Sequence, residues 1–242
     1  KNRPRELTYD GDSYYFSLDK STSKKLKDIC DREGISLFML LLGVFKVLLY
    51  KYSNQNDVVV GSPIANRSYK EIEPIIGFFV NTLVLRSYVD SRESFSKLLE
   101  QIKKITLEGY EHQDIPFEQL VDYLKIERSI NKNPVFQVMF VLQNAVNDDY
   151  QFQDIEREHL TLPYNVSKFD LLLEAFESRD EIRFRIEYSK DLYNEQTVIR
   201  MSEHYRNIVS AIVNNLHVEI GKIDILTKEE KSQILEGWNA TA

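Results

Sequence analysis

The chain of 242 residues is acidic, with a formal charge of −7, and 43% of its residues are hydrophobic. It is long enough to bury a substantial core in one large domain or two small ones. The acidic balance and the lack of a long basic run argue against nucleic acid or an anionic membrane as the main partner.

The lone cysteine and the polar first segment bear on the cellular compartment that we expect for the protein. Cys30 has no second cysteine to pair with, so nothing indicates an oxidising compartment. It follows Leu26 and Ile29 at helical spacing, which predicts a small apolar core residue rather than a catalytic thiol. Lys1–Glu6 leads into no apolar signal segment, and the apolar run Leu37–Tyr50 is too short to span a membrane. We therefore expect a soluble, cytoplasmic protein.

The first part of the chain predicts two helices and a strand. Ser21–Ser23 offers N-caps for a helix that Gly34 would end. Leu37–Tyr50 follows at once and is typical of a helix buried on nearly every side. Asp57–Gly61 is short, β-branched and ended by glycine, as in an interior strand. Ser62–Pro74 is predicted to be a polar connection.

The middle of the chain continues the alternation. Thr82–Arg86 predicts a strand, and the apolar face of Phe95–Tyr110 predicts a helix capped by Ser91 or Ser94. Pro116 suits the first turn of the next helix, where Glu118 complements the helix dipole. Val135–Leu142 then predicts a strand rich in Val and Phe, and polar Asn144–Tyr164 predicts a mobile loop.

The last part predicts a hairpin and two helices. Phe169–Tyr188 forms the hairpin, and Ile182–Tyr188 alternates strictly, with Arg183, Arg185 and Glu187 facing away from the core. Val198–Leu216 is a long amphipathic helix. Thr227 and Glu230 form a capping box for a short helix that ends near Gly237. Strands alternate with helices throughout, so the fold class is α/β, in one domain whose sheet is covered on at least one face.

Several common sites are excluded by the residues present. With eight glycines in all, the chain has no Gly-rich phosphate loop. His112, His159, His204 and His217 have no partners at metal-ligand spacing, so no metal site is predicted. Ser62 lacks the second glycine of a nucleophile elbow and is predicted to be a turn residue.

Gly77–Thr82 and His112–Glu118 hold the candidate site residues. Gly77 permits close approach of a ligand, and Asn81 and Thr82 place an amide and a hydroxyl where a strand begins. Such a strand end can bind a ligand amide, or it can form a turn satisfied within the chain, and both interpretations stay open. An imidazole is a candidate general base at neutral pH. His112, however, lies between two predicted helices and has no orienting carboxylate, so it is predicted, with Gln113 and Pro116, to be structural and near the site.

Five segments, in chain order, resemble the condensation domains of nonribosomal peptide synthetases. They are Asp57–Arg67, Gly77–Thr82 (Gly-x-Phe-Val-Asn-Thr), His112–Glu118 (His-Gln-x-x-Pro-Phe-Glu), Asn133–Asn144 and Lys168–Leu171. Ile225–Thr241 also resembles the linker toward an adenylation domain. Each motif is weak alone, but five in order are highly specific. The resemblance implies domain bounds of 1–225 for a condensation lobe and 226–242 for the start of that linker.

One departure from the family is decisive for catalysis. The family's His-His-x-x-x-Asp-Gly motif is missing, since the chain has no adjacent pair of histidines. Arg3–Arg5 resembles the stretch that joins the two halves of the family's domain. The resemblance therefore implies a C-terminal lobe with a chloramphenicol-acetyltransferase-like fold, a mixed β-sheet flanked by helices, and no catalytic residue in this chain.

The implied function is amide-bond formation between carrier-bound acyl groups, in antibiotic or secondary-metabolite biosynthesis. This lobe would supply a tunnel wall, with Gly77, Asn81 and Thr82 lining it, and a docking surface for carrier domains. The lobe would bind no cofactor itself, because the substrates arrive on phosphopantetheine. Implied partners are the N-terminal condensation lobe, two peptidyl carrier domains and an adenylation domain. A non-catalytic recruiting platform and an epimerisation-domain relative remain as alternatives, and a coenzyme-A-dependent acyltransferase is less favoured.

Overall fold

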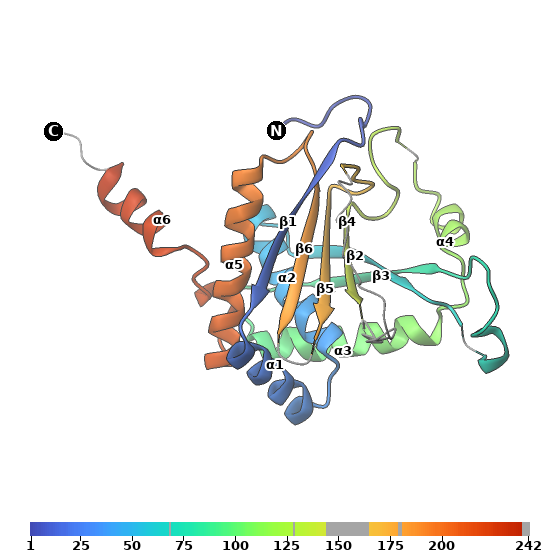
Figure 1. Cartoon of the computed structure of the whole chain (residues 1–242), viewed down its shortest axis with the longest axis horizontal. Helices are drawn as coiled ribbons and strands as arrows, with labels where there is room; N and C mark the ends of the chain where they lie inside the picture. The colour runs from blue at the N-terminus through green and yellow to red at the C-terminus, as the bar shows by residue number, and fades with distance from the viewer. Residues whose placement is uncertain (68, 128, 144–164, 179–180, 239–242) are drawn as a thin grey trace, which may run out of the picture.

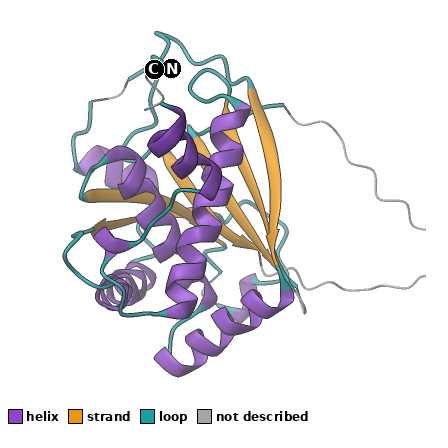
Figure 2. Ribbon diagram, turned by 90° about the vertical axis from the view of Figure 1, so that its left-hand side faces the viewer, coloured by secondary structure: helices purple, strands orange, loops and turns teal. Residues whose placement is uncertain are grey.

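A six-stranded sheet with helices packed against one face forms the body of the chain (Figures 1 and 2). The structure, a computed structural model, describes residues 1–67, 69–127, 129–143, 165–178 and 181–238. The predicted loop Asn144–Tyr164 lies outside the described residues. The mixed sheet and its flanking helices confirm the predicted fold class.

The sheet has the strand order β1-β6-β5-β4-β2-β3. Strand β4 runs parallel to β5 and β2, and the other neighbours are antiparallel. Between β2 and β4 the register holds a single pair, Gly61 with Met139, so the sheet is weakly joined there. The strands are β1 (Gly11–Leu18), β2 (Asp57–Ile64), β3 (Asn81–Tyr88), β4 (Val138–Gln143), β5 (Leu171–Glu177) and β6 (Ile182–Ser189).

Helix α2 lies at the centre of the helical layer, in contact with three other helices and with the sheet. Every residue of Met39–Leu48 is buried, as the long apolar run predicts, because this helix touches the sheet as well as α1, α3 and α5. The helices are α1 (Lys20–Glu33), α2 (Leu37–Ser53), α3 (Phe95–Glu111), α4 (Phe117–Tyr123), α5 (Glu195–Asn214) and α6 (Lys228–Ser232). The structure also has three short helical turns, η1 (Lys70–Ile72), η2 (Ile220–Lys222) and η3 (Gln233–Gly237).

The helix ends test the capping predictions. Asp19, not Ser21–Ser23, caps α1, because its carboxylate accepts the Thr22 N–H at 2.9 Å. Gly34 ends that helix with φ 60°, as predicted. Ser94 rather than Ser91 caps α3. Pro116 occupies the N-cap of α4, one residue ahead of its first turn.

The strands show two errors of the sequence analysis. Strand β1 was not predicted, although Tyr14, Phe16 and Leu18 alternate with polar neighbours, and it forms an edge of the sheet beside β6. Ser62 is not a turn residue. Strand β2 continues to Ile64, and the buried Ser62 hydroxyl donates to the Phe140 carbonyl oxygen at 2.9 Å.

The alternation of β6 is confirmed on its core side, where Ile182, Phe184, Ile186 and Tyr188 are all buried. On the opposite side Arg183 is exposed, but Arg185 and Glu187 are largely covered. The Arg185 guanidinium lies 2.5 Å from the Glu174 carboxylate and 3.7 Å from that of Glu187. The pairing accounts for this burial of charge.

No single helix in the described part of the chain is both long and apolar enough to cross a membrane. Helices α1 and α2 meet those criteria only jointly, and they are bent by 110° to each other.

Candidate functional site

Asn81 joins the two candidate motifs at the start of β3. Its side-chain amide donates to the carbonyl oxygens of Gln113 and Ile115, both at 2.8 Å. Its carbonyl oxygen accepts the N–H of Thr82 at 2.8 Å and that of Phe117 at 3.0 Å. Asn81 is only 8% exposed. Three of these four bonds, those to Gln113, Ile115 and Phe117, hold Gly77–Thr82 and His112–Glu118 together, as the sequence alone could not specify.

Arg67 organises the loop that leads into this strand. Its guanidinium donates to the carbonyl oxygens of Ile72, Glu73 and Ile75. The same group lies 4.3 Å from the centre of the Phe79 ring, a cation–π contact. Arg67 therefore binds three carbonyl groups of the loop and also contacts the Phe79 ring. Sequence analysis did not single out Arg67 as a site residue.

Along the chain, Gly77 and Thr82 flank Phe79 and Asn81. A Cβ added to Gly77 would lie 3.0 Å from the Phe79 ring, so a larger residue would displace that ring. Thr82 pairs with Pro63 across β2 and β3 and is half-buried. Whether Gly77, Asn81 and Thr82 line a substrate tunnel stays a prediction.

His112 and Gln113 form the junction between α3 and α4 mainly through their backbone. His112 ends α3 and is exposed, and its carbonyl oxygen accepts the Ile115 N–H at 3.3 Å. Gln113 contributes the carbonyl oxygen that Asn81 binds. Pro116 is the N-cap of α4. No ion pair with a carboxylate is found for the His112 imidazole among the residues that the structure describes.

Aromatic rings pack against the second motif at Phe117. Phe136 stacks with Phe169 at 5.9 Å and contacts Phe117 at 5.5 Å between ring centres. Val135 aims Phe136 from a three-residue turn, in which the Phe136 N–H donates to the Pro134 carbonyl oxygen at 2.8 Å. Val135 has φ 69°, a left-handed conformation that costs a β-branched residue energy.

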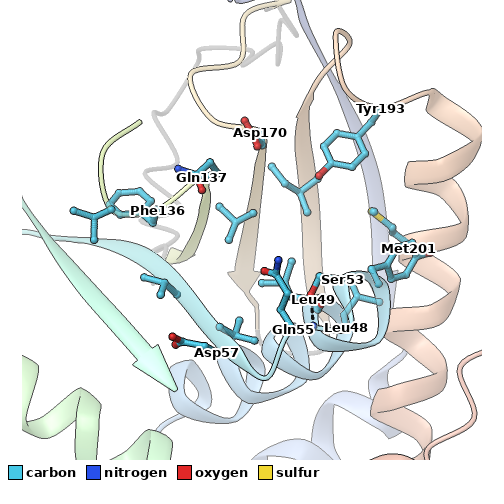
Figure 3. A pocket seen from close by; sticks show the side chains of 16 residues that line it. Leu48, Leu49, Ser53, Gln55, Asp57, Phe136, Gln137, Asp170, Tyr193 and Met201 are labelled. Atoms are coloured by element: carbon cyan, nitrogen blue, oxygen red, sulfur yellow. Dashed lines mark hydrogen bonds between the residues drawn. The ribbon is translucent and has the colours of Figure 1, made fainter. Parts of the chain in front are cut away.

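One cavity lies away from the two motifs, where β2 and β4 separate (Figure 3). Its volume is about 480 Å³. Leu48, Leu49 and Met201 form an apolar floor, and Gln137, Asp170 and Tyr193 supply polar groups. None of the predicted site residues lines it. A smaller cavity of about 150 Å³ is lined by Ser62, Pro63, Leu83 and Tyr110, among others, closer to Asn81 along the strands.

Two buried polar groups outside the motifs also escaped the sequence analysis. Lys46 is fully buried within α2, and its Nζ donates to the carbonyl oxygens of Val58 and Leu85 and to the Ser87 hydroxyl. Burial lowers its pKa to about 7. His204, dismissed as a scattered histidine, is 5% exposed and bonded through both ring nitrogens. In the sequence, the one indication that Lys46 is buried was its position within an apolar helix.

Metal binding and thiol chemistry find no support in the arrangement. Within the described ranges, no three His, Cys, Asp or Glu side chains come together to hold a metal ion. Cys30 is buried, and burial raises its pKa to about 12, so the thiol stays protonated. This confirms the core position predicted for Cys30.

An exposed apolar surface borders the two motifs. Ile76 is 100% exposed, Phe78 92% and Tyr123 84%. We call the surface formed by six residues the motif face: Ile75, Ile76, Phe78, Val80, Ile115 and Tyr123. Exposed apolar residues this numerous within and beside the two motifs make the region a candidate interaction surface.

Comparison with known proteins places the chain in one family. The condensation-domain family model matches residues 1–235. The chain is 40% identical to gramicidin S synthase 2 of Aneurinibacillus migulanus, over 99% of this chain and 5% of that protein. It is 38% identical to tyrocidine synthase 3 of Brevibacillus parabrevis, over 99% of this chain and 4% of that protein. The chain thus spans a small part of these relatives.

Solved structures share its fold. A four-domain nonribosomal peptide synthetase bound to AMP and glycine matches 95% of this chain with a TM-score of 0.85 and 24% identity, over 19% of its own length. The X-domain from teicoplanin biosynthesis matches 93% of this chain with a TM-score of 0.84 and 20% identity, over 52% of its length. The condensation domain of the Monacolin K polyketide synthase matches 90% of this chain with a TM-score of 0.78 and 19% identity, over 51% of its length.

Proposed function

Because this chain belongs to the condensation-domain family of nonribosomal peptide synthetases, we propose that it is one of two lobes of a peptide-bond-forming domain. The observation that carries this proposal is coverage: nearly the whole chain matches about half of solved single-domain structures, 52% and 51% of their lengths. This coverage supports the proposal that the chain corresponds to one half of such a domain. The proposed product class is an antibiotic or other secondary metabolite, as the names of the relatives suggest.

The proposed reaction joins two carrier-bound acyl groups. The amine of the acceptor attacks the carbonyl carbon of the donor thioester, a C–N bond forms, the C–S bond breaks, and the proton lost from the amine balances the departing thiolate. The histidine that would position the amine or accept its proton belongs to the family's His-His-x-x-x-Asp-Gly motif, which no segment of this sequence contains. The role left for this lobe is to position the substrates and exclude water.

We assign this positioning to the region around Asn81. Gly77 and Thr82 would border the phosphopantetheine tunnel, and the missing Cβ of Gly77 leaves room there for the Phe79 ring. The Asn81 amide already makes four hydrogen bonds within the chain, so it acts by fixing both loops rather than by gripping the arm. His112, Gln113 and Pro116 hold the second loop beside it.

The proposed partners follow from the same assignment. The N-terminal lobe would cover the motif face, whose exposed Ile76 and Phe78 fit an apolar contact. Donor and acceptor carrier domains would deliver their phosphopantetheine arms, so the lobe itself binds no cofactor. Residues 226–242 would lead toward an adenylation domain.

A chimeric synthetase tests this function. The matching 239-residue segment of gramicidin S synthase 2 of Aneurinibacillus migulanus, 40% identical, is replaced by this chain. Carrier domains loaded with donor and acceptor amino acids are then added, and peptide formation is followed by mass spectrometry. We expect product from the chimera and none above background from the isolated chain.

Two controls interpret the result. Replacing the second histidine of the host's His-His-x-x-x-Asp-Gly motif by alanine should abolish product from the chimera. A chimera that melts cooperatively, docks its carriers and still forms no peptide would contradict the proposed role. Turnover by the isolated chain would contradict the assignment of catalysis to the other lobe.

A recruiting platform is the second candidate, and one comparison favours it. A structure described as a complex of the X-domain and OxyB from teicoplanin biosynthesis matches 94% of this chain with a TM-score of 0.84 and 20% identity. A lobe of this fold can therefore belong to a domain that binds another protein. An inactive but well-folded chimera that captures a further protein of the same synthetase would favour this alternative.

A further inference from the structure

His204 links three helices at a place remote from the candidate motifs. It lies on α5, where its Nδ1 is 2.8 Å from the hydroxyl of Tyr52 on α2. Its Nε2 is 2.7 Å from the carboxylate of Glu230 on α6. The imidazole is 5% exposed, so both ring nitrogens find their partners within the protein. We call Tyr52, His204 and Glu230 the clasp.

The atoms of the clasp can satisfy one another. A neutral imidazole donates from Nε2 to the Glu230 carboxylate and accepts the Tyr52 O–H at Nδ1, and an imidazolium donates from both nitrogens, because the Tyr52 oxygen also accepts. Burial raises the pKa of Tyr52 to about 12, which keeps its phenol protonated. Burial also tends to raise the pKa of Glu230, but the hydrogen bonds from His204 and the Thr227 N–H and the charge of Arg200 lower it overall. The carboxylate therefore stays an acceptor.

Helix α6 makes this contact at its first turn. Glu230 also accepts the Thr227 N–H at 2.9 Å, while the Thr227 hydroxyl accepts the Glu230 N–H at 3.2 Å, so the predicted capping box is present. One carboxylate thus starts the helix and joins it to α5. Beyond this turn, α6 and η3 extend away from the sheet and α5 (Figure 1), and Leu235 and Trp238 are 69% and 68% exposed.

From this arrangement we infer that His204 is a positioning residue that fixes the direction in which the C-terminal helix leaves the lobe. The helix has five residues, too few to be stable by itself. Besides the clasp, the ion pair of Lys231 with Asp224 joins it to the preceding segment, but that pair is exposed and such pairs stabilise little, so the buried contact is the main one at its start. Removing the clasp releases residues 228–238 as a unit and leaves the sheet and its helices folded. The inference concerns this helix alone and does not depend on the proposed function.

The sole tryptophan of the chain, Trp238, reports on this helix directly. We compare fluorescence anisotropy and amide hydrogen exchange in the wild type and in His204→Phe. This substitution replaces the imidazole by an aromatic ring that can make neither hydrogen bond. We expect lower anisotropy and about tenfold or faster exchange over residues 228–237, since a hydrogen bond to a charged group is lost. Exchange in α3 and the strands should not change.

A matched control uses another histidine. His217 is exposed, and its Nδ1 lies 2.9 Å from the Ser96 hydroxyl, so His217→Phe removes a comparable bond far from α6 and should leave Trp238 unaffected. Unchanged anisotropy and exchange in a folded His204→Phe variant would overturn the inference, as would an equal effect of His217→Phe.

A second pair of variants covers the case in which His204→Phe does not fold. Glu230→Ala removes both the clasp and half of the capping box, whereas Thr227→Ala removes the other half of the box and spares the clasp. Faster exchange in Glu230→Ala than in Thr227→Ala supports a positioning role for His204. Equal exchange in the two variants contradicts it, because the cap alone would then hold the helix.

Discussion

At the residue scale, Lys46 gives the chain a specific dependence of stability on pH. Burial lowers its pKa from 10.5 to about 7 in the folded protein. Between these values the unfolded chain binds more protons than the folded one, so stability rises with pH. From pH 7 to pH 9 we expect the free energy of unfolding to rise by up to about 1.4 kcal/mol per pH unit on account of Lys46. Urea unfolding at several pH values measures this slope.

The Lys46→Met variant isolates the contribution of Lys46. Burial also lowers the pKa of Lys51, so part of the slope persists, and the difference between the two proteins is the quantity of interest. Lys104→Met, at an exposed position with its side chain 74% accessible, should match the wild type. An equal slope in Lys46→Met and the wild type would show that the Lys46 ammonium stays charged between its acceptors.

Asn81→Ala should destabilise the chain markedly. The substitution leaves the carbonyl oxygens of Gln113 and Ile115 and the N–H groups of Thr82 and Phe117 without their partner. Each buried group left unsatisfied costs about 1–3 kcal/mol unless water reaches it. We expect a total loss of about 2–4 kcal/mol, measured by thermal or urea unfolding.

Two further variants sharpen the test at Asn81. Asn81→Asp keeps the acceptor but turns a carboxylate toward two carbonyl oxygens, so it should be no better tolerated than alanine. Asn214→Ala, at an exposed position near the end of α5, should change stability little. A cost below about 0.5 kcal/mol for Asn81→Ala, the size of a surface effect, would mean that the two loops do not depend on its amide.

At the scale of elements, the contact between β2 and β4 depends on the missing side chain of Gly61. A Cβ at this position would overlap the Phe136 ring, and Gly61 with Met139 is the one pair in the register between these strands. Gly61→Ala should therefore cost about 1–3 kcal/mol through overpacking. The double variant Gly61→Ala/Phe136→Leu should recover part of this loss, because a smaller side chain makes room. Additive losses in the two single variants would contradict the proposed overlap.

The same elements show what the sequence could predict. Local patterns were sufficient for α2, α3, α5 and the capping box at Thr227, because periodicity and caps depend on neighbours a few residues away. Asp19 was missed as a cap because Ser21–Ser23 offers side chains suited to the same role. Strand β1 and the role of Ser62 depend on β6 and Phe140, which lie far away in sequence. No local rule specifies such partners.

For the candidate site, too, local patterns predicted one part and contacts between distant residues determined the rest. The motifs were located by their residues, but their connection through Asn81 spans 32 to 36 positions. The roles of Arg67 and His204 likewise depend on a folded loop and on three packed helices. The sequence indicated which segments hold candidate site residues. Which of their atoms contact one another depends on the tertiary structure.

At the scale of the whole molecule, the motif face should make the chain self-associate. A side chain such as Ile76, 100% exposed, gains by leaving water, at roughly 25 cal/mol per Å² of apolar surface covered. We expect the apparent mass from light scattering to rise with protein concentration. The double variant Ile76→Ser/Phe78→Ser should shift the onset of association to several-fold higher concentration, because it removes the two most exposed apolar side chains of the motif face.

A control on another part of the surface distinguishes this face from general stickiness. Tyr15 on β1 and Tyr88 on β3 are 61% and 59% exposed, and neither belongs to the motif face. Tyr15→Ser/Tyr88→Ser should leave the concentration dependence unchanged. If both double variants delay association equally, the contact is nonspecific. A wild-type chain that stays monomeric at the highest concentration would mean that the motif face is stable in water, and the apolar contact proposed with a second lobe would lose its physical basis.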